Sequence, residues 1–147
     1  MPKNSQDVVI VSALRTAIGK YKGMWAKIEA HNLGKSVIQN ILSQSKVNQS
    51  SIDEVIMGQV LTGGTGQNPA RQAARDAGIP DEKTAYVINQ VCGSGLRAII
   101  SGYQSILLND SKIVIAGGQE NMSFSNKDNM LQDGLIDAFN NYHMGVT

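Results

Sequence analysis

Short apolar runs rich in β-branched residues alternate with helical segments along this chain, and no other feature limits the possible folds as strongly. Such runs are typical of strands buried on both faces of a sheet. The strands predicted in this way are Asp7–Leu14, Ile52–Leu61, Thr84–Asn89 and Lys112–Ala116. Because strands and helices alternate with short links, we expect an α/β fold in β-α-β-α-β-α-β order, with a mostly parallel sheet covered on both faces.

Apolar residues with helical spacing fill the segments between these runs. Asn68 and Pro69 predict a helix start, with asparagine as cap and proline at the first helical position. Asn32 is read as the cap of an earlier helix. The remaining predicted helices are Gly93–Asn109 and Asp133–Tyr142. In Gly93–Asn109 we expect the large apolar residues to face inward, namely Leu96, Ile99, Ile100, Tyr103, Ile106 and Leu107.

Composition excludes several classes of protein. The 147 residues are enough for one domain with its own core. A net charge of +1 is too weak to indicate nucleic-acid binding, and no run is long enough for a membrane span. A single cysteine excludes an internal disulfide and a cysteine-rich zinc site, so no metal is expected and a reducing, cytoplasmic compartment fits.

That cysteine, Cys92, lies where a predicted strand gives way to a helix, in the segment NQVCGSGLRA. A thiol at a helix N-terminus meets the positive end of the macrodipole, which favours the nucleophilic thiolate. Gly93 and Gly95 leave room for a substrate carbonyl, and the Cys92 N–H is a candidate oxyanion donor. A buried cysteine that packs as a small hydrophobe is the alternative reading.

The two histidines and the glycine-rich loops give weaker signals. Either His31 or His143 is a candidate base for Cys92, or simply a surface or core residue, since their spacing requires neither role. The loop Gly63–Gly66 lacks the lysine and hydroxyl residue of a phosphate-binding P-loop. These loops therefore give only weak support for a nucleotide-phosphate site.

Around Cys92 the sequence resembles the active-site segment of the thiolases, in their acetyl-CoA acetyltransferase branch. Further stretches resemble that family in the same order along nearly the whole chain. These are Val11–Gly19, Gly66–Ala74, Ala116–Ser123 and Tyr142–Gly145. The resemblance implies a thiolase-like half with an incomplete sheet, and a reaction that condenses two acetyl-CoA to acetoacetyl-CoA or cleaves the product by thiolysis. It implies that Cys92 carries the acyl group and that His143 and Met144 line the acyl pocket. Coenzyme A would be a substrate and not a bound prosthetic group, so the resemblance implies no resident cofactor.

The chain also departs from the thiolase pattern. The Gly-His-Pro histidine and the Cys-x-Gly-x-Gly cysteine, which the resemblance places in a second half, do not occur in these residues. Ser123–Gln132 is shorter than the corresponding family connection. We therefore expect residues 1–120 to form the N-terminal half-domain and 121–147 the start of a shortened loop domain. We expect the lone chain to be truncated, inactive and prone to aggregate, although intact thiolases form homo-oligomers.

Two other functions stay open from the sequence. The chain is a candidate for a non-enzymatic fragment that docks on a separate C-terminal thiolase half. It is also a candidate for a condensing enzyme of the ketoacyl synthase type, which uses a cysteine nucleophile on a similar fold. The Asn68–Arg71 and Tyr142–Gly145 matches favour the thiolases.

Overall fold

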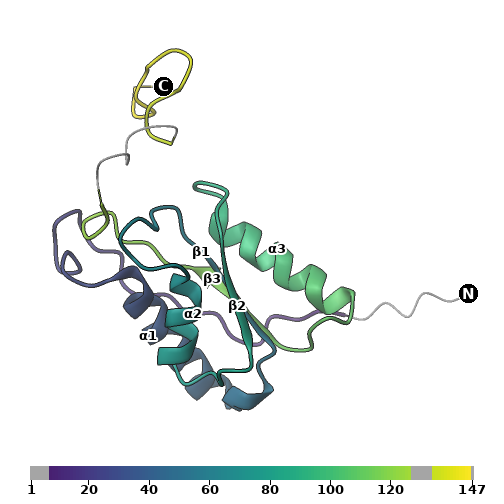
Figure 1. The fold of residues 1–147 in the computed structure, drawn as a ribbon. Helices are drawn as coiled ribbons and strands as arrows, with labels where there is room; N and C mark the ends of the chain where they lie inside the picture. Colours follow the sequence, from purple (N-terminus) through teal and green to yellow (C-terminus); the bar gives the residue numbers. More distant parts are fainter. Residues whose placement is uncertain (1–6, 127–133, 147) are drawn as a thin grey trace, which may run out of the picture.

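A three-stranded parallel sheet, with helices on both faces, forms the body of the molecule (Figure 1). The computed structural model describes residues 7–126 and 134–146. The strand order is β2-β1-β3, so the central strand pairs in parallel with both neighbours. The elements are α1 (Ala30–Ser45), the short 3-10 helix η1 (Gln49–Ser51), β1 (Glu54–Gly58), α2 (Pro69–Asp76), β2 (Thr84–Ile88), α3 (Ser94–Leu107) and β3 (Val114–Gly118). The expected parallel sheet with helices on both faces is confirmed.

Helices α1 and α2 cover one face of the sheet and enclose the main core. Ile38 and Leu42 of α1 pack with Val55 and Met57 of β1, while α2 contributes small residues that bring it close. The buried alanines of α2 and the residue after it are Ala70, Ala73, Ala74 and Ala77. The predicted start of α2 is confirmed, because the Asn68 side chain accepts a hydrogen bond from the Arg71 N–H at 2.9 Å.

Helix α3 covers the opposite face, and here the predicted inward stripe is wrong. Its buried residues are the small ones, Ser94, Ala98 and Gly102. A Cβ on Gly102 would lie 3.0 Å from Val114 Cγ1, so this helix rests closely on β3. The large residues expected inside are exposed or only partly buried: Leu96, Ile99, Ile100, Tyr103, Ile106 and Leu107. Small residues let the helix approach the sheet, and this leaves the large ones on the outer side.

The predicted strand Asp7–Leu14 is not formed. This segment has no strand assignment, and Val9, Ile10 and Val11 are each at least 72% exposed. A strand needs a neighbouring strand to accept and donate its backbone hydrogen bonds, and the described residues give it none. The predicted cap Asn32 is also wrong, because α1 begins at Ala30 and its N-cap position is Glu29, whose side chain makes no capping hydrogen bond.

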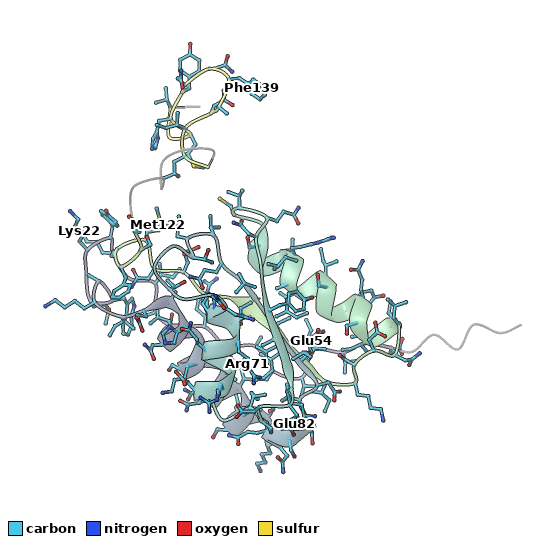
Figure 2. All side chains as sticks on the ribbon, viewed as in Figure 1. Lys22, Glu54, Arg71, Glu82, Met122 and Phe139 are labelled. Atoms are coloured by element: carbon cyan, nitrogen blue, oxygen red, sulfur yellow. The ribbon has the colours of Figure 1, made fainter. Side chains whose placement is uncertain are left out.

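The predicted helix Asp133–Tyr142 is also wrong over its described residues. Residues 134–146 form turns and an antiparallel bridge between Ile136 and His143. Asn141 has a φ of +56°, which no helix interior accommodates. Figure 2 shows Phe139 on this loop pointing away from the body, and it is 93% exposed.

Residues 121–126 are tied to the long loop before α1. The Asn121 side-chain amide donates to the Trp25 and Ile28 carbonyls at 2.7 and 2.5 Å. The Lys22 N–H donates to Ser123 Oγ at 2.7 Å, and Figure 2 shows Lys22 and Met122 at the same end of the molecule. The division at residue 120 stays a prediction.

Candidate active site

A tight loop joins the end of β2 to the start of α3 (Figure 1). It contains the candidate nucleophile Cys92. This loop stands at the carboxyl edge of the parallel sheet, where open α/β sheets bind their ligands. Cys92 is a free thiol and is exposed. The alternative of a buried cysteine that packs as a small hydrophobe is therefore wrong, and the thiol is accessible to a substrate.

Glycine at the end of the central strand sets the position of this loop. A Cβ on Gly58 would come within 2.5–2.7 Å of the backbone of Ser94 and Gly95, and one on Gly118 would lie 3.5 Å from the Gly95 Cα. Real Cβ atoms do not approach backbone as closely as the Gly58 position would require, so the first turn of α3 rests directly on the ends of β1 and β3. No side chain stands between the sheet and this turn.

Val91, immediately before Cys92, has a left-handed backbone. Its φ is +49°, a region that β-branched residues avoid. Such a conformation costs about 1–3 kcal/mol and persists only when the surroundings impose it. The strain lies next to the candidate nucleophile, where strained backbone is commonly found in enzymes.

Two polar side chains hold the strained turn. Ser94 Oγ accepts a hydrogen bond from the Gln90 N–H at 2.8 Å and donates to the Val91 carbonyl at 2.6 Å. Asn89 Oδ1 accepts from the Val91 N–H at 2.9 Å. The backbone adds bonds from the Gly93 N–H to the Gln90 carbonyl and from the Ser94 N–H to the Val91 carbonyl. Both backbone polar groups of Val91 are therefore bound.

A half-buried carboxylate connects the strand ends around this loop. Glu120, after β3, accepts hydrogen bonds from the Val60 N–H at 2.7 Å and from the Leu61 N–H at 3.4 Å. The Asn89 amide reaches the Val60 carbonyl at 3.5 Å. Burial raises the pKa of Glu120, and the backbone hydrogen bonds oppose that rise. The carboxylate thus fixes the segment after β1 against which Asn89 rests.

The two predicted pocket residues lie on the loop 134–146. His143 and Met144 are exposed; the Gly145 N–H donates to His143 Nδ1 at 3.0 Å and the Met144 N–H to the Leu135 carbonyl at 2.8 Å. The loop begins beside the candidate nucleophile, because a Cβ on Gly134 would lie 3.7 Å from Val91 Cγ1. No hydrogen bond or ion pair joins His143 to Cys92 among the described residues.

The other candidate base, His31, lies elsewhere. Its Nε2 is 3.4 Å from a Glu29 carboxylate oxygen and 3.9 Å from one of Asp76, between helices α1 and α2. It is a structural residue on the face of the sheet opposite α3.

Within residues 7–126 and 134–146, no three His, Cys, Asp or Glu side chains are grouped to hold a metal ion. Nor is any described helix long and apolar enough to cross a membrane.

Sequence reasoning misses the groups that hold the Cys92 turn. The motif around Cys92 contains Ser94 and Gly95, but the pattern alone predicts only open space for a substrate. The structure gives Ser94 a hydrogen-bonding role instead, and it shows that Gly58 is the glycine whose missing side chain admits the helix. Neither the left-handed Val91 nor the Glu120 contact leaves a pattern in the sequence.

Comparison with known proteins shows the family. The sequence profile of the thiolase N-terminal domain matches residues 8–130. An acetyl-CoA acetyltransferase of Pseudomonas aeruginosa is 49% identical over 97% of this chain and 40% of its own length. The cytosolic acetyl-CoA acetyltransferase of Rattus norvegicus is 47% identical over 100% of this chain and 41% of its own length. The chain thus spans about 40% of the length of the curated relatives it matches.

The alignment with the rat enzyme indicates an internal difference in length. It runs over 163 positions and takes in all 147 residues, so 163 − 147 = 16 positions have no residue in this chain. The chain is therefore shorter than the matching part of that relative.

Solved structures agree with the sequence relatives. The Acat5 thiolase from Ascaris suum, in complex with coenzyme A, superposes with a TM-score of 0.91 at 35% identity, over 96% of this chain and 41% of that one. The acetyl-CoA acetyltransferase of Bacillus anthracis gives 0.86 at 33% identity, over 93% and 39%. The profile match and these superpositions cover nearly all of the chain, which therefore belongs to the thiolase family and carries its N-terminal domain.

Proposed function

We propose that this chain supplies the nucleophile of an acetyl-CoA C-acetyltransferase. The observation that carries the proposal is an accessible Cys92 in a constrained turn at the carboxyl edge of a thiolase N-terminal domain. The relatives are named acetyl-CoA acetyltransferases, and one structural neighbour is bound to coenzyme A. These names favour a thiolase over a ketoacyl synthase.

The proposed first step is acyl transfer to the thiolate. The Cys92 sulfur attacks the thioester carbonyl of acetyl-CoA and forms a new carbon–sulfur bond, while the carbon–sulfur bond to coenzyme A breaks. The coenzyme A thiolate leaves and takes up a proton. The negative charge on the carbonyl oxygen is transient, and the Cys92 N–H is the proposed donor to it. The N-terminus of α3 adds a favourable field at the thiol.

The proposed second step makes the carbon–carbon bond. A second acetyl-CoA loses an α-proton, and its carbon attacks the acetyl-cysteine, which releases acetoacetyl-CoA and the free Cys92 thiol. The reverse direction is thiolysis. Neither a second cysteine nor a Gly-His-Pro histidine is present in the 147 residues to move that proton. We therefore propose that the lone chain performs acyl transfer at most.

His143 and Met144 are proposed to line the acyl pocket. Their loop begins at Gly134 beside Val91, so it borders the turn that holds the nucleophile.

Coenzyme A thioesters are proposed as substrates and not as resident cofactors. Residues 121–147 are proposed to begin a shortened loop domain. A cytoplasmic location is proposed because a 47% identical relative is described as cytosolic.

A second function is favoured by the exposed outer face of α3. A chain that covers about 40% of its relatives and leaves a large apolar helix face uncovered fits a fragment that docks on a separate C-terminal thiolase half. We also propose that the intact relatives form homo-oligomers.

Intact-protein mass spectrometry after exposure to acetyl-CoA tests acyl transfer. We expect a mass increase of one acetyl group, mapped to Cys92 and absent from Cys92→Ser. The heat-unfolded chain, which keeps the thiol but loses the turn, is the background control. Equal acetylation of folded and unfolded chains would contradict a reactive site formed by the folded chain.

Condensation assays with and without a co-expressed C-terminal half of a relative separate the two functions: acetoacetyl-CoA should form only with that half.

A further inference from the structure

Ser94 is buried, although the turn that precedes it is exposed. The residue is 4% exposed, although Gln90, Val91, Cys92 and Gly93 before it are all exposed. A serine hydroxyl has one hydrogen to donate, and here it goes to the Val91 carbonyl at 2.6 Å. The same oxygen accepts from the Gln90 N–H at 2.8 Å. The side chain thus clamps the two residues that precede the thiol.

The clamped residue is the strained one. Val91 has a φ of +49°, and its carbonyl is bound by both the N–H and the hydroxyl of Ser94. Its own N–H is bound by Asn89 Oδ1 at 2.9 Å. A valine released from these bonds would relax to an extended or right-handed backbone. Because β2 and α3 are both packed in the fold, the short link between them, which includes Cys92, would have to absorb that rotation, and the thiol would shift relative to the first turn of α3.

We infer that Ser94 is a positioning residue for Cys92: its buried hydroxyl holds Val91 in the left-handed conformation and thereby fixes the thiol at the N-terminus of α3. This inference rests on the proposed role of Cys92 as nucleophile. Ser94 does not touch the substrate in this role. It acts through the backbone of Val91, with Asn89 as the second support of the same turn.

The test measures the rate at which iodoacetamide labels Cys92 in the folded 147-residue chain at neutral pH. Ser94→Ala should label about two- to fivefold more slowly, because the displaced thiol stays accessible but loses the favourable field of the helix N-terminus. Ser105→Ala is the matched control, because Ser105 lies at the far end of α3 and donates its hydroxyl to Ser111 at 3.0 Å. It removes a comparable bond from the same helix and should label at the rate of the parent.

A glycine at position 91 separates positioning from general stability. Glycine adopts positive φ without strain, so Val91→Gly should label at the parent rate. It should also recover most of the rate when combined with Ser94→Ala. A merely structural serine would give no such recovery, because the glycine restores no bond. Asn89→Ala should also slow labelling. Because the Asn89 side chain is exposed, this variant replaces Ser94→Ala in the test if Ser94→Ala does not fold.

The outcomes distinguish this inference from the proposed function. If the parent is acetylated by acetyl-CoA but Ser94→Ala labels at the parent rate, the positioning role is overturned while the nucleophile stands. The positioning role is also overturned if Ser105→Ala slows labelling as much as Ser94→Ala, or if Val91→Gly brings no recovery. If the parent is not acetylated yet the alkylation rates follow the expected order, the turn is held by Ser94 and the proposed function fails alone.

Discussion

The two faces of the sheet are covered by helices in opposite ways. On one face, α1 presents large residues such as Ile38 and Leu42 to the strands, and both are at most 6% exposed. On the other face, α3 presents Ala98 and Gly102, while its Leu96 remains 65% exposed. The first face is a finished core. The second is a helix lying close to the sheet, with its large apolar residues turned to the outside.

This difference matters for the site because Cys92 belongs to the second face. Its turn opens α3, and the helix can rest on Gly58 only because its inner side is small. The close approach that fixes the thiol therefore requires the large side chains of α3 to lie on its outer side. A face of this kind is typical of surfaces that meet another protein segment. The uncovered face of α3 and the constrained turn at Cys92 thus have the same structural cause, the close approach of this helix to the sheet.

The largest expected effect comes from a matched pair of leucines. Leu42→Ala in α1 should lower the free energy of unfolding by about 2–5 kcal/mol, because it leaves a cavity in the core. Leu96→Ala in α3 should change it by no more than about 0.5 kcal/mol, because this side chain packs against little. Urea unfolding followed by circular dichroism measures both. Similar losses for the two variants would show that the outer face of α3 is also covered in solution, and would contradict the difference between the two faces.

A pair of glycines gives the next effect. Gly58→Ala should lower the free energy of unfolding by about 1–3 kcal/mol, as expected when a methyl group is forced into packed atoms. Its Cβ would meet the Ser94 and Gly95 backbone at 2.5–2.7 Å. Gly95→Ala meets nothing within 4 Å and should stabilise the helix by about 0.5–1 kcal/mol. Thermal unfolding compares the two, and a neutral Gly58→Ala would mean that α3 does not rest on the sheet.

Sequence patterns located most elements of both faces, since strands β1 to β3 and helices α1 to α3 all overlap predicted segments. They did not orient α3. Periodicity identifies the large apolar stripe, and burial of large residues is the usual outcome. Here backbone proximity decides, and it favours Ala98 and Gly102. Which stripe faces the sheet depends on the strands beneath it, which local sequence does not contain.

Predictions for the segment 7–14 and the Cys92 turn fail for related reasons. Val9, Ile10 and Val11 have strand composition, but a strand forms only beside a partner, and partners are nonlocal. The position of Cys92 was predictable from its motif. The left-handed Val91 and the Ser94 clamp were not, because valine disfavours positive φ and only the surrounding hydrogen bonds impose it. Strained sites are where local reasoning is expected to fail.

Opposite pH dependences should distinguish the two ends of the sheet. At the site edge, burial raises the folded pKa of Glu120 above the ordinary value of about 4.3, so the folded state binds more protons between the two values. Its contribution is fully present at low pH and is lost as the pH rises through the folded pKa. Glu120→Gln keeps an oxygen for the Val60 N–H and should remove that fall.

Asp53, just before β1, provides the contrast. Hydrogen bonds from the Lys112 and Ile113 N–H groups lower its pKa, with a smaller contribution from the charge of Lys83. Its stabilisation is therefore present above about pH 3.9 and is lost as the pH falls through the lowered pKa. Asp53→Asn should flatten the acid limb only. Stability measured by urea unfolding between about pH 3 and 8, in roughly unit steps, checks both signs. A pH profile unchanged by Glu120→Gln would contradict the argument that partial burial raises the pKa of this carboxyl group.

Substitutions on the outer face of α3 should have the smallest effect on stability, and they test directly whether this face is uncovered. Replacing Leu96 and Tyr103 by lysine should change the free energy of unfolding by about 0.5 kcal/mol or less, because both side chains are at least half exposed. The same double variant should reduce self-association and the binding of a hydrophobic dye, since a contiguous apolar patch drives both.

Phe139→Lys is the control: Phe139 is 93% exposed but lies on the separate loop 134–146. Size-exclusion chromatography with light scattering across a concentration series measures association. If Phe139→Lys lowers association as much as the double variant does, exposure alone explains it and the α3 face has no special role. If only the double variant does so, the association arises from the helix that rests closely on the sheet and has the candidate nucleophile Cys92 just before its start.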